Sequence, residues 1–167
     1  MTTNPALVLK AERLRFPGML PAEILVWLSW LAAHDSEYTN WQYNFRIGAG
    51  IDPGPQVEEY WRNLAIKSTQ LRLDAVGYQG DTPTIFEVKR RATPSNIGQL
   101  AVYFYAWVHD FPNAPRPKLV LVFNTQQAEI THAALAVGIQ LVQVEADFSR
   151  LRAATAVRRA GVNPLNG

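Results

Sequence analysis

The chain has 167 residues, 48% of them hydrophobic and 18% charged, which is typical of one folded domain and excludes a disordered chain. It contains no cysteine, which excludes disulfides, thiolate metal sites and cysteine nucleophiles. The net charge of +2 permits a nucleic-acid partner only where positive side chains cluster. The sequence shows no secretory signal and no apolar run of membrane-spanning length, so we expect neither secretion nor a membrane partner.

The first third of the chain predicts one helix and one strand. Residues 1–20 show no clear periodicity and are expected to be irregular. Residues 21–34 begin with a proline and carry apolar residues at helical spacing, which predicts a helix. Residues 38–47 alternate aromatic and polar side chains, as a half-exposed strand does. A glycine- and proline-rich loop follows at 48–55, and residues 55–67 are compatible with either a short helix or an irregular segment.

The rest of the chain alternates strands and helices. Residues 69–78 and 84–91 predict two strands joined by a turn at Gly80-Asp81. The remaining predicted elements are a helix at 95–108, a strand buried on both faces at 118–123, a helix at 129–137, a strand at 139–144 and a basic helix at 148–159. This order predicts an α/β fold in which a central mixed sheet is flanked by helices. We expect one domain over residues 1–167, with a core at about 21–144 and a basic C-terminal extension at 145–167.

Three charged residues interrupt the two central strands. Asp74 lies in the first strand, and Glu87 and Lys89 lie two residues apart, hence on one face, in the second. Charged side chains inside strands are costly unless they are paired or bound to a metal. Mg²⁺ prefers one or two carboxylates together with water and substrate oxygens. The two carboxylates, with the backbone carbonyl of Val88, therefore predict a divalent-metal site.

Lys89 and the following helix supply further polar groups. Lys89 is placed to hold an attacking water or a developing negative charge, and partial burial near a metal is expected to lower its pKa. On the helix, Asn96, Gln99 and Tyr103 share one stripe, which would overlook the strand pair.

These residues resemble a known family. Asp74, then Glu87-Val88-Lys89 after a hairpin, then Gly98-Gln99-Leu100 with Tyr103, is similar to the pattern of the PD-(D/E)xK nuclease superfamily. The likeness is greatest to its exonuclease-like and Holliday-resolvase-like branches and to small phage-encoded members. It covers about residues 21–144, with Leu73 where many members have proline. The resemblance implies a restriction-endonuclease-like αβββαβ core, Mg²⁺ or Mn²⁺ as the cofactor, and cleavage of DNA.

The resemblance also implies roles for individual residues. Asp74 and Glu87 would bind the metal, and Lys89 would be the catalytic lysine. Gln99 would orient that lysine or the substrate. Glu23 matches the acidic residue that many members carry on the first helix, where it supports a metal through water.

Three further side chains are candidates for binding substrate. Arg91 shares a strand face with Glu87 and Lys89, and could contact phosphates. Asn96 and Tyr103 belong to the polar helix stripe.

Structural interpretations of the same residues stay open. Asp74 could be an edge charge that faces solvent, and Glu87 with Lys89 an ordinary surface pair. Gln99 could be a solvated helix residue. An acidic residue at position 23 is favourable near a helix N-terminus whatever the function.

A second function is also open. The chain resembles small phage-encoded members of the family, so it could be a structural virion component, at a head-completion, neck or tail-connector position, that retains the nuclease fold. Many aromatic residues, which are enriched at interfaces, favour this alternative. Both termini read as irregular, so ordered termini would indicate protein assembly partners. The expected partner is DNA under the first hypothesis and also protein under the second, and the expected location is the host cytoplasm or the virion.

Overall fold

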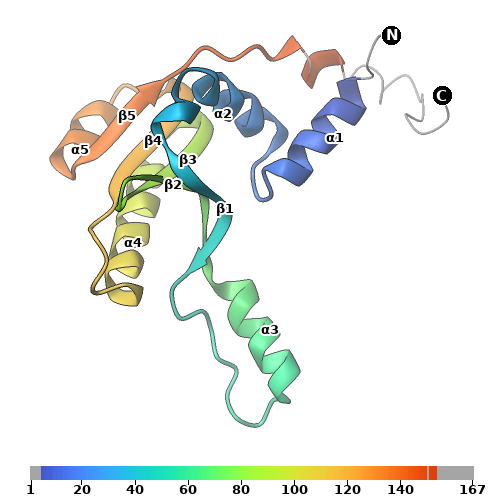
Figure 1. The fold of residues 1–167 in the computed structure, drawn as a ribbon, viewed down its shortest axis with the longest axis vertical. Helices are drawn as coiled ribbons and strands as arrows, with labels where there is room; N and C mark the ends of the chain where they lie inside the picture. The colour runs from blue at the N-terminus through green and yellow to red at the C-terminus, as the bar shows by residue number, and fades with distance from the viewer. Residues whose placement is uncertain (1–4, 150, 154–167) are drawn as a thin grey trace.

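The computed structural model describes residues 5–149 and 151–153 (Figure 1). Its helices are α1 (Pro5–Arg15), α2 (Pro21–His34), α3 (Glu59–Thr69), α4 (Pro94–Asp110) and α5 (Ile130–Ala136), with a short 3-10 helix at Asp35–Glu37. Its strands are β1 (Thr39–Ile47), β2 (Leu71–Gln79), β3 (Thr82–Ala92), β4 (Lys118–Gln126) and β5 (Ile139–Gln143). No helix among the described residues combines the length and the apolar character that crossing a membrane requires.

The strands form one mixed sheet, as the sequence predicted. Their order in space is β1-β2-β3-β4-β5, with antiparallel pairing from β1 to β3 and parallel pairing from β3 to β5. Parallel neighbours need a crossover connection, and α4 and α5 supply the two crossovers. Between β2 and β3, Gly80 has a φ of +58°, which glycine adopts readily at the first position of a tight hairpin turn.

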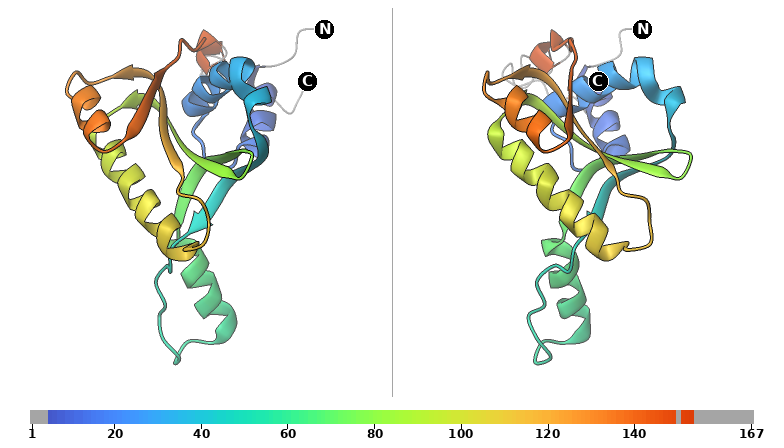
Figure 2. Two further views of the ribbon diagram at one scale, coloured as in Figure 1. Left: turned by 60° about the vertical axis from the view of Figure 1, so that its left-hand side comes forward. Right: turned by 90° about the vertical axis from the view of Figure 1, so that its left-hand side faces the viewer.

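Helices cover both faces of the sheet (Figure 2). On one face, α4 and α5 pack on alternate residues of the strands, including Leu121 and Phe123. On the other face, α2 packs on the residues between them, including Val120 and Val122. β4 is therefore buried on both faces, which confirms the reading of its continuous apolar run.

An aromatic cluster fills the α2 face. Trp27 and Trp30 of α2 contact Phe86 of β3 and Trp41 of β1 with ring centroids 4.8–6.1 Å apart. Trp41 lies directly on Gly77, where an added Cβ would come within 2.5 Å of the indole ring. Most of the aromatic residues of this region thus serve the core.

The structure corrects the reading of the N-terminal segment. Residues 5–15 form α1, where we expected an irregular chain. The side chains of α1 are described at positions 10–15, and five of these six are exposed. A helix that faces solvent needs no apolar stripe toward a core, and that stripe is the pattern by which a helix is recognised in a sequence.

The ends of the chain bear on two other expectations. The predicted basic helix at 148–159 is described only in part: residue 148 precedes the helix, residues 149 and 151–153 are helical, and residues 150 and 154–159 lie outside the described residues. The expectation of ordered termini concerns residues 1–4 and 154–167, which lie outside the described residues. The start of the extension packs on α2, because Ala146, Phe148 and Leu151 contact Leu25.

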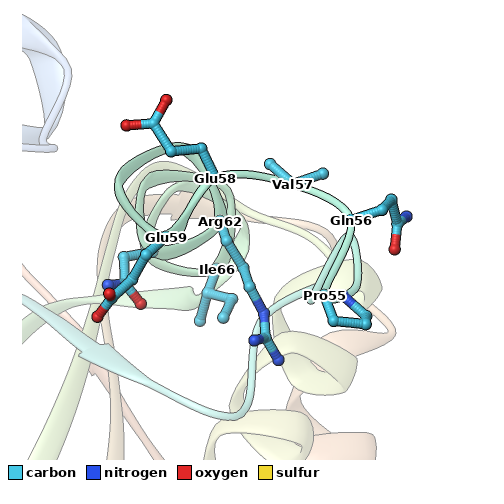
Figure 3. Close-up of a pocket in the computed structure, with 8 residues that line it drawn as sticks. Pro55, Gln56, Val57, Glu58, Glu59, Arg62 and Ile66 are labelled. Atoms are coloured by element: carbon cyan, nitrogen blue, oxygen red, sulfur yellow. The ribbon is translucent and has the colours of Figure 1, made fainter.

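A lobe formed by residues 48–70 projects from the sheet between β1 and β2 (Figure 1). It contains α3, which resolves the open alternative at 55–67 in favour of a helix. Its side chains enclose no core, since no residue of α3 is buried. A shallow hollow on the lobe is lined by Pro55, Gln56, Val57, Glu58, Glu59, Arg62, Asn63 and Ile66 (Figure 3).

Polar contacts hold the lobe together. The guanidinium of Arg62 donates two hydrogen bonds to the carboxylate of Asp52, one of them 2.6 Å long. The amide of Gln70 donates to the carbonyl of Gly48 at 2.8 Å and closes the base of the lobe. The hydrogen bonds from Arg62 lower the pKa of Asp52 to about 2.

Candidate active site

The site lies where β2 and β3 separate. The two strands are paired from Gln79 and Thr82 as far as Ala75 and Phe86. Asp74 and Glu87 would form the next pair, but the backbone pairing stops before them. Instead, Oδ2 of the Asp74 side chain accepts the N–H of Val88 at 2.8 Å. The opening between the strands thus places both carboxylates side by side.

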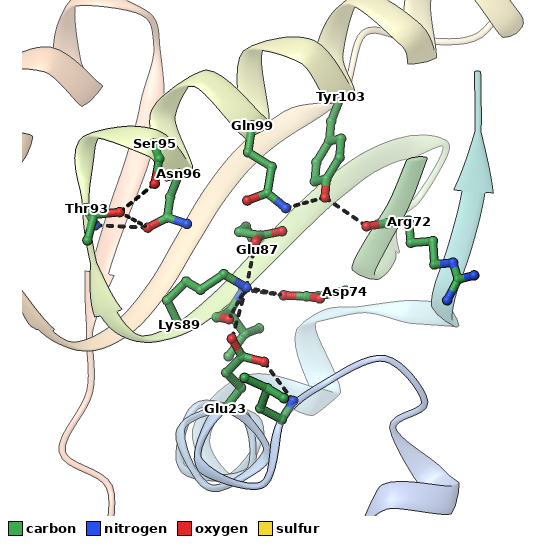
Figure 4. Close-up of polar contacts among 12 residues, drawn as sticks. Glu23, Arg72, Asp74, Glu87, Lys89, Thr93, Ser95, Asn96, Gln99 and Tyr103 are labelled. Carbon is green, nitrogen blue, oxygen red and sulfur yellow. Dashed lines mark hydrogen bonds and ion pairs between the residues drawn. The ribbon is translucent and has the colours of Figure 1, made fainter. Parts of the chain in front are cut away.

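Lys89 brings the acidic residues together (Figure 4). Its Nζ lies 2.7 Å from Oε1 of Glu87, 3.1 Å from Oε1 of Glu23 and 3.4 Å from Oδ2 of Asp74. It also donates to the carbonyl of Val88 at 3.0 Å. The predicted convergence of Asp74, Glu87 and Lys89 is therefore observed, and these residues are neither an exposed strand edge nor an ordinary surface pair.

Glu23 serves both the helix and the site. It lies in the first turn of α2, where its Oε2 accepts the N–H of Leu20 at 2.7 Å and caps the helix. Its other oxygen faces Lys89. The helix-end and site interpretations of this residue therefore hold together.

Burial is graded across the site. The Glu87 side chain is fully buried, whereas 23% of the Lys89 side chain and 13% of the Asp74 side chain are exposed. The site therefore opens to solvent at Lys89 and Asp74, with Glu87 at its base. Within the described part of the chain, neither carboxylate oxygen of Glu87 accepts a well-oriented hydrogen bond, although Lys89 lies within ion-pair distance.

The protonation of the site follows from this geometry. Burial, with the nearby charge of Asp74, raises the pKa of Glu87 to about 7. Burial also raises the pKa of Asp74. For Lys89, burial alone would lower the pKa, but the charges of Asp74, Glu87 and Glu23 outweigh it, and the pKa is raised. Three acidic residues of the chain surround one ammonium here, whereas the expectation of a lowered lysine pKa depends on a nearby metal and stays a prediction.

The oxygen atoms of the site are of the kind that binds a divalent cation, but the Lys89 ammonium lies among them. No group of three or more His, Asp or Glu side chains among the described residues is arranged around a point that a metal could take. Asp74, Glu87 and the Val88 carbonyl instead point at the Lys89 ammonium. The carboxylates of Asp74 and Glu87 and the carbonyl of Val88 form a donor set that fits a hard cation such as Mg²⁺, and both buried oxygens of Glu87 lack a hydrogen bond among the described residues.

The helix stripe is organised through Tyr103. The hydroxyl of Tyr103 donates to the carbonyl of Arg72 at 2.8 Å and accepts a hydrogen bond from the amide of Gln99. This chain of contacts ties α4 to β2 two residues before Asp74. Gln99 points from α4 toward Glu87 (Figure 4), but its described hydrogen bond goes to Tyr103 rather than to Lys89.

The three residues predicted to bind substrate lie in different surroundings. Tyr103 is buried and engaged with Arg72, and Asn96 is buried with its Oδ1 accepting from the N–H and the hydroxyl of Thr93 at the start of α4. Both therefore hold the helix in place in this structure. Arg91 is exposed, and its contact with substrate stays a prediction.

The structure adds two residues that the sequence reasoning did not select. Arg46 of β1 and Arg72 of β2 are register partners, and both side chains are exposed. Their adjacency depends on the pairing of β1 with β2, for which the sequence carries no direct signal.

Comparisons with known proteins give little further information. No protein-family model and no curated protein matches the chain. Among solved structures, the crystal structure of AF1548, a protein of unknown function, matches 84% of this chain and 78% of its own, with a TM-score of 0.46 and 11% identity. A likeness at this level carries no argument about activity, so the functional conclusion depends on the site.

Proposed function

We propose that the protein is a Mg²⁺- or Mn²⁺-dependent deoxyribonuclease of the PD-(D/E)xK type. The observation that carries this proposal is the meeting of Asp74, Glu87 and Lys89 at the separation of two central strands. The order α2, β1, β2, β3, α4, β4 supports the finer fold as well, since it is that of a restriction-endonuclease-like αβββαβ core with the α3 lobe inserted after β1.

The residues divide into those that would hold the ion and those that act around it. Asp74, Glu87 and the carbonyl of Val88 would hold the ion, and Glu23 would support it. The bound ion neutralises charge on the phosphate and lowers the pKa of a coordinated water. Because Lys89 now contacts the same oxygens, the ammonium and the ion compete for them.

Lys89 and the helix residues act through hydrogen bonds. The Lys89 ammonium, which contacts four oxygens of the chain here, would exchange some of these contacts for a hydrogen bond to an attacking water or to the phosphate oxygen that gains negative charge. Glu23 keeps the lysine charged and directed into the site. Tyr103 and Gln99 hold the start of β2, and so fix the backbone that carries Asp74.

The first prediction concerns cleavage. Purified protein with Mg²⁺ or Mn²⁺ is expected to cut at least one of single-stranded, duplex and branched DNA, and EDTA is expected to stop it. Glu87→Ala and Lys89→Ala should each lower the rate by about 100-fold or more, since the first removes a ligand of the ion and the second removes the donor to the attacking water or the phosphate oxygen. The exposed residues Glu58 and Lys118 provide matched controls, and their alanine variants should cut at the wild-type rate.

A measurement without turnover completes this test. Mn²⁺ should raise the melting temperature of the wild-type protein, because an ion that binds only the folded state stabilises it. Asp74→Asn should abolish this shift. A wild-type protein that cuts none of the DNA forms and shows no ion-dependent shift would refute the proposal.

A second candidate function is a structural virion component that retains the fold. The observation that favours it is one face of α3, where Tyr60, Trp61 and Leu64 are 47–64% exposed. Exposed aromatic residues are enriched at protein interfaces. Light scattering of the native complex tests this candidate, and a monomer that cuts DNA and co-purifies with no partner would contradict it.

A further inference from the structure

Two arginines face each other across β1 and β2. The register pairs Arg46 directly with Arg72, and both side chains are exposed. Like charges directly opposite each other on antiparallel strands repel and are destabilising. Such a pair requires an explanation other than stability.

Nothing in the described part of the chain neutralises this pair. The ion pairs there involve Asp52, Arg62, Lys89 with its three carboxylates, and His109 with Asp110, but neither Arg46 nor Arg72. The guanidinium groups also donate no hydrogen bond to any described residue. Two adjacent guanidinium groups without a partner form a site that suits an anion, above all phosphate, which the planar arginine fork binds in a bidentate manner.

The position of the pair connects it with the candidate active site. Arg72 lies two residues before Asp74, and its carbonyl is fixed by the hydroxyl of Tyr103. Its side chain extends away from α4 (Figure 4). Arg72 is thus attached to the same short stretch of backbone as one of the carboxylates of the site, and Arg46 lies beside it on the neighbouring strand.

The charge of the site makes such a pair necessary for a polyanionic substrate. Asp74, Glu87 and Glu23 surround a single ammonium, so the site carries excess negative charge when its carboxylates are ionised. A strand of nucleic acid is repelled by these carboxylates, and its affinity must come from cations beside them. Arg72, two residues before Asp74, and its register partner Arg46 supply two such charges.

We infer that Arg46 and Arg72 together bind a backbone phosphate of the substrate strand, next to the phosphodiester that is cut. This inference rests on the proposed nuclease function. It assigns the base of the α3 lobe, where β1 ends and β2 begins, to the path of the nucleic acid.

The test measures DNA binding separately from cleavage. Fluorescence anisotropy of a labelled oligonucleotide, single-stranded and duplex, is recorded in EDTA between about 50 and 200 mM KCl. Arg46→Gln/Arg72→Gln is expected to weaken binding by about tenfold at the low-salt end, and to reduce the slope of log affinity against log salt by about one. Arg46→Lys/Arg72→Lys should retain the salt slope but lose part of the affinity, because lysine keeps the charge without the fork.

A matched control removes two charges elsewhere. Arg116 and Lys118 are exposed, and Lys118 is in register with Thr84, at the opposite end of β3 from Lys89. Arg116→Gln/Lys118→Gln should bind DNA with nearly the wild-type slope. The Mn²⁺-dependent rise in melting temperature should persist in the Arg46→Gln/Arg72→Gln variant, which shows that the carboxylates are intact.

The outcomes separate this inference from the proposed function. If the wild-type protein binds and cuts DNA and Arg46→Gln/Arg72→Gln has the same affinity and slope, the inference is wrong and the nuclease assignment stands. An equal loss in the Arg116→Gln/Lys118→Gln control also refutes it, because the effect would then be one of overall charge. A wild-type protein that neither binds nor cuts DNA refutes both.

Discussion

Burial of the Glu87 carboxylate in the site lowers the stability of the fold. Its side chain is fully buried in a strand between two hydrophobic layers, and its oxygens lack well-oriented hydrogen bonds among the described residues. The raised pKa of Glu87, about 7, reflects this loss of stability. Compared with the unfolded chain, the folded protein favours the protonated carboxyl group over the charged carboxylate, which is the form that binds a metal. A purely structural strand would place an apolar residue here.

This cost predicts a stabilising substitution. The folded-state pKa of Glu87 lies above its ordinary value of 4.5, so the wild-type protein loses stability as the pH rises from about 4.5 through 7. Lys89 does not change this dependence, because its raised pKa keeps it charged throughout the range. Without metal, Glu87→Gln should gain about 1–3 kcal/mol relative to wild type between pH 5 and pH 8. Chemical denaturation in EDTA at both pH values measures this gain.

The control for this prediction is an exposed glutamate. Glu58→Gln should show the same stability difference from wild type at both pH values, since its side chain lies in solvent. A Glu87→Gln variant whose advantage is absent at pH 8, or equal at the two pH values, would show that burial of the charge is not the cause.

At the scale of elements, α4 is fixed to β2 by one hydroxyl. Tyr103 is the residue through which the helix reaches the carbonyl of Arg72. Tyr103→Phe keeps the packing of the ring but leaves that carbonyl without this donor. We expect a loss of about 1–2 kcal/mol of unfolding free energy, measured by urea denaturation.

A second tyrosine of the same helix provides the comparison. Tyr105 is 73% exposed, so Tyr105→Phe should change the unfolding free energy by less than about 0.5 kcal/mol. Equal effects of the two substitutions would mean that the contact of Tyr103 with Arg72 does not stabilise the protein.

The elements that the sequence predicted well are those that bury a patterned face. The continuous apolar run of β4 and the hairpin of β2 and β3 each follow from local residues, and all are observed. Asp74, Glu87 and Lys89 could be selected because charged residues are unusual at such strand positions. By contrast, α1 was missed because most of its described side chains face solvent.

The parts of the site that could not be predicted depend on long-range register. The resemblance placed Glu23 in the site, but its contact with Lys89 depends on the packing of α2 across β3. The Arg46–Arg72 pair depends on the register of β1, which shifts between Thr39 and Gln42. β1 also contains Asn40 and Asn44 at a φ of 53°, a conformation that no alternation pattern predicts.

At the scale of the whole molecule, the body and the α3 lobe differ in how they are held. The body has two hydrophobic layers, whereas α3 buries no residue and the lobe depends on polar contacts such as Asp52 with Arg62. Segments with few buried apolar contacts open locally at lower free energy than a core. Amide hydrogen exchange should therefore be faster in α3 than in β2, β3 and β4.

Asp52→Asn tests whether the ion pair holds the lobe. The substitution removes the charge that Arg62 binds, so exchange in α3 should accelerate while exchange in the sheet stays unchanged, as followed by mass spectrometry.

The pKa of Asp52 is lowered to about 2, so the ion pair of Asp52 with Arg62 contributes fully above the ordinary pKa of 3.8 and is lost as the pH falls through 2. The wild-type lobe should thus keep its protection at pH 4, once exchange rates are corrected for pH. Glu58→Gln, in the same lobe but outside this pair, should leave α3 exchange as in wild type. If Asp52→Asn accelerated exchange in β2 and β3 equally, the lobe and the body would form one cooperative unit, and the lobe could not open independently of the sheet.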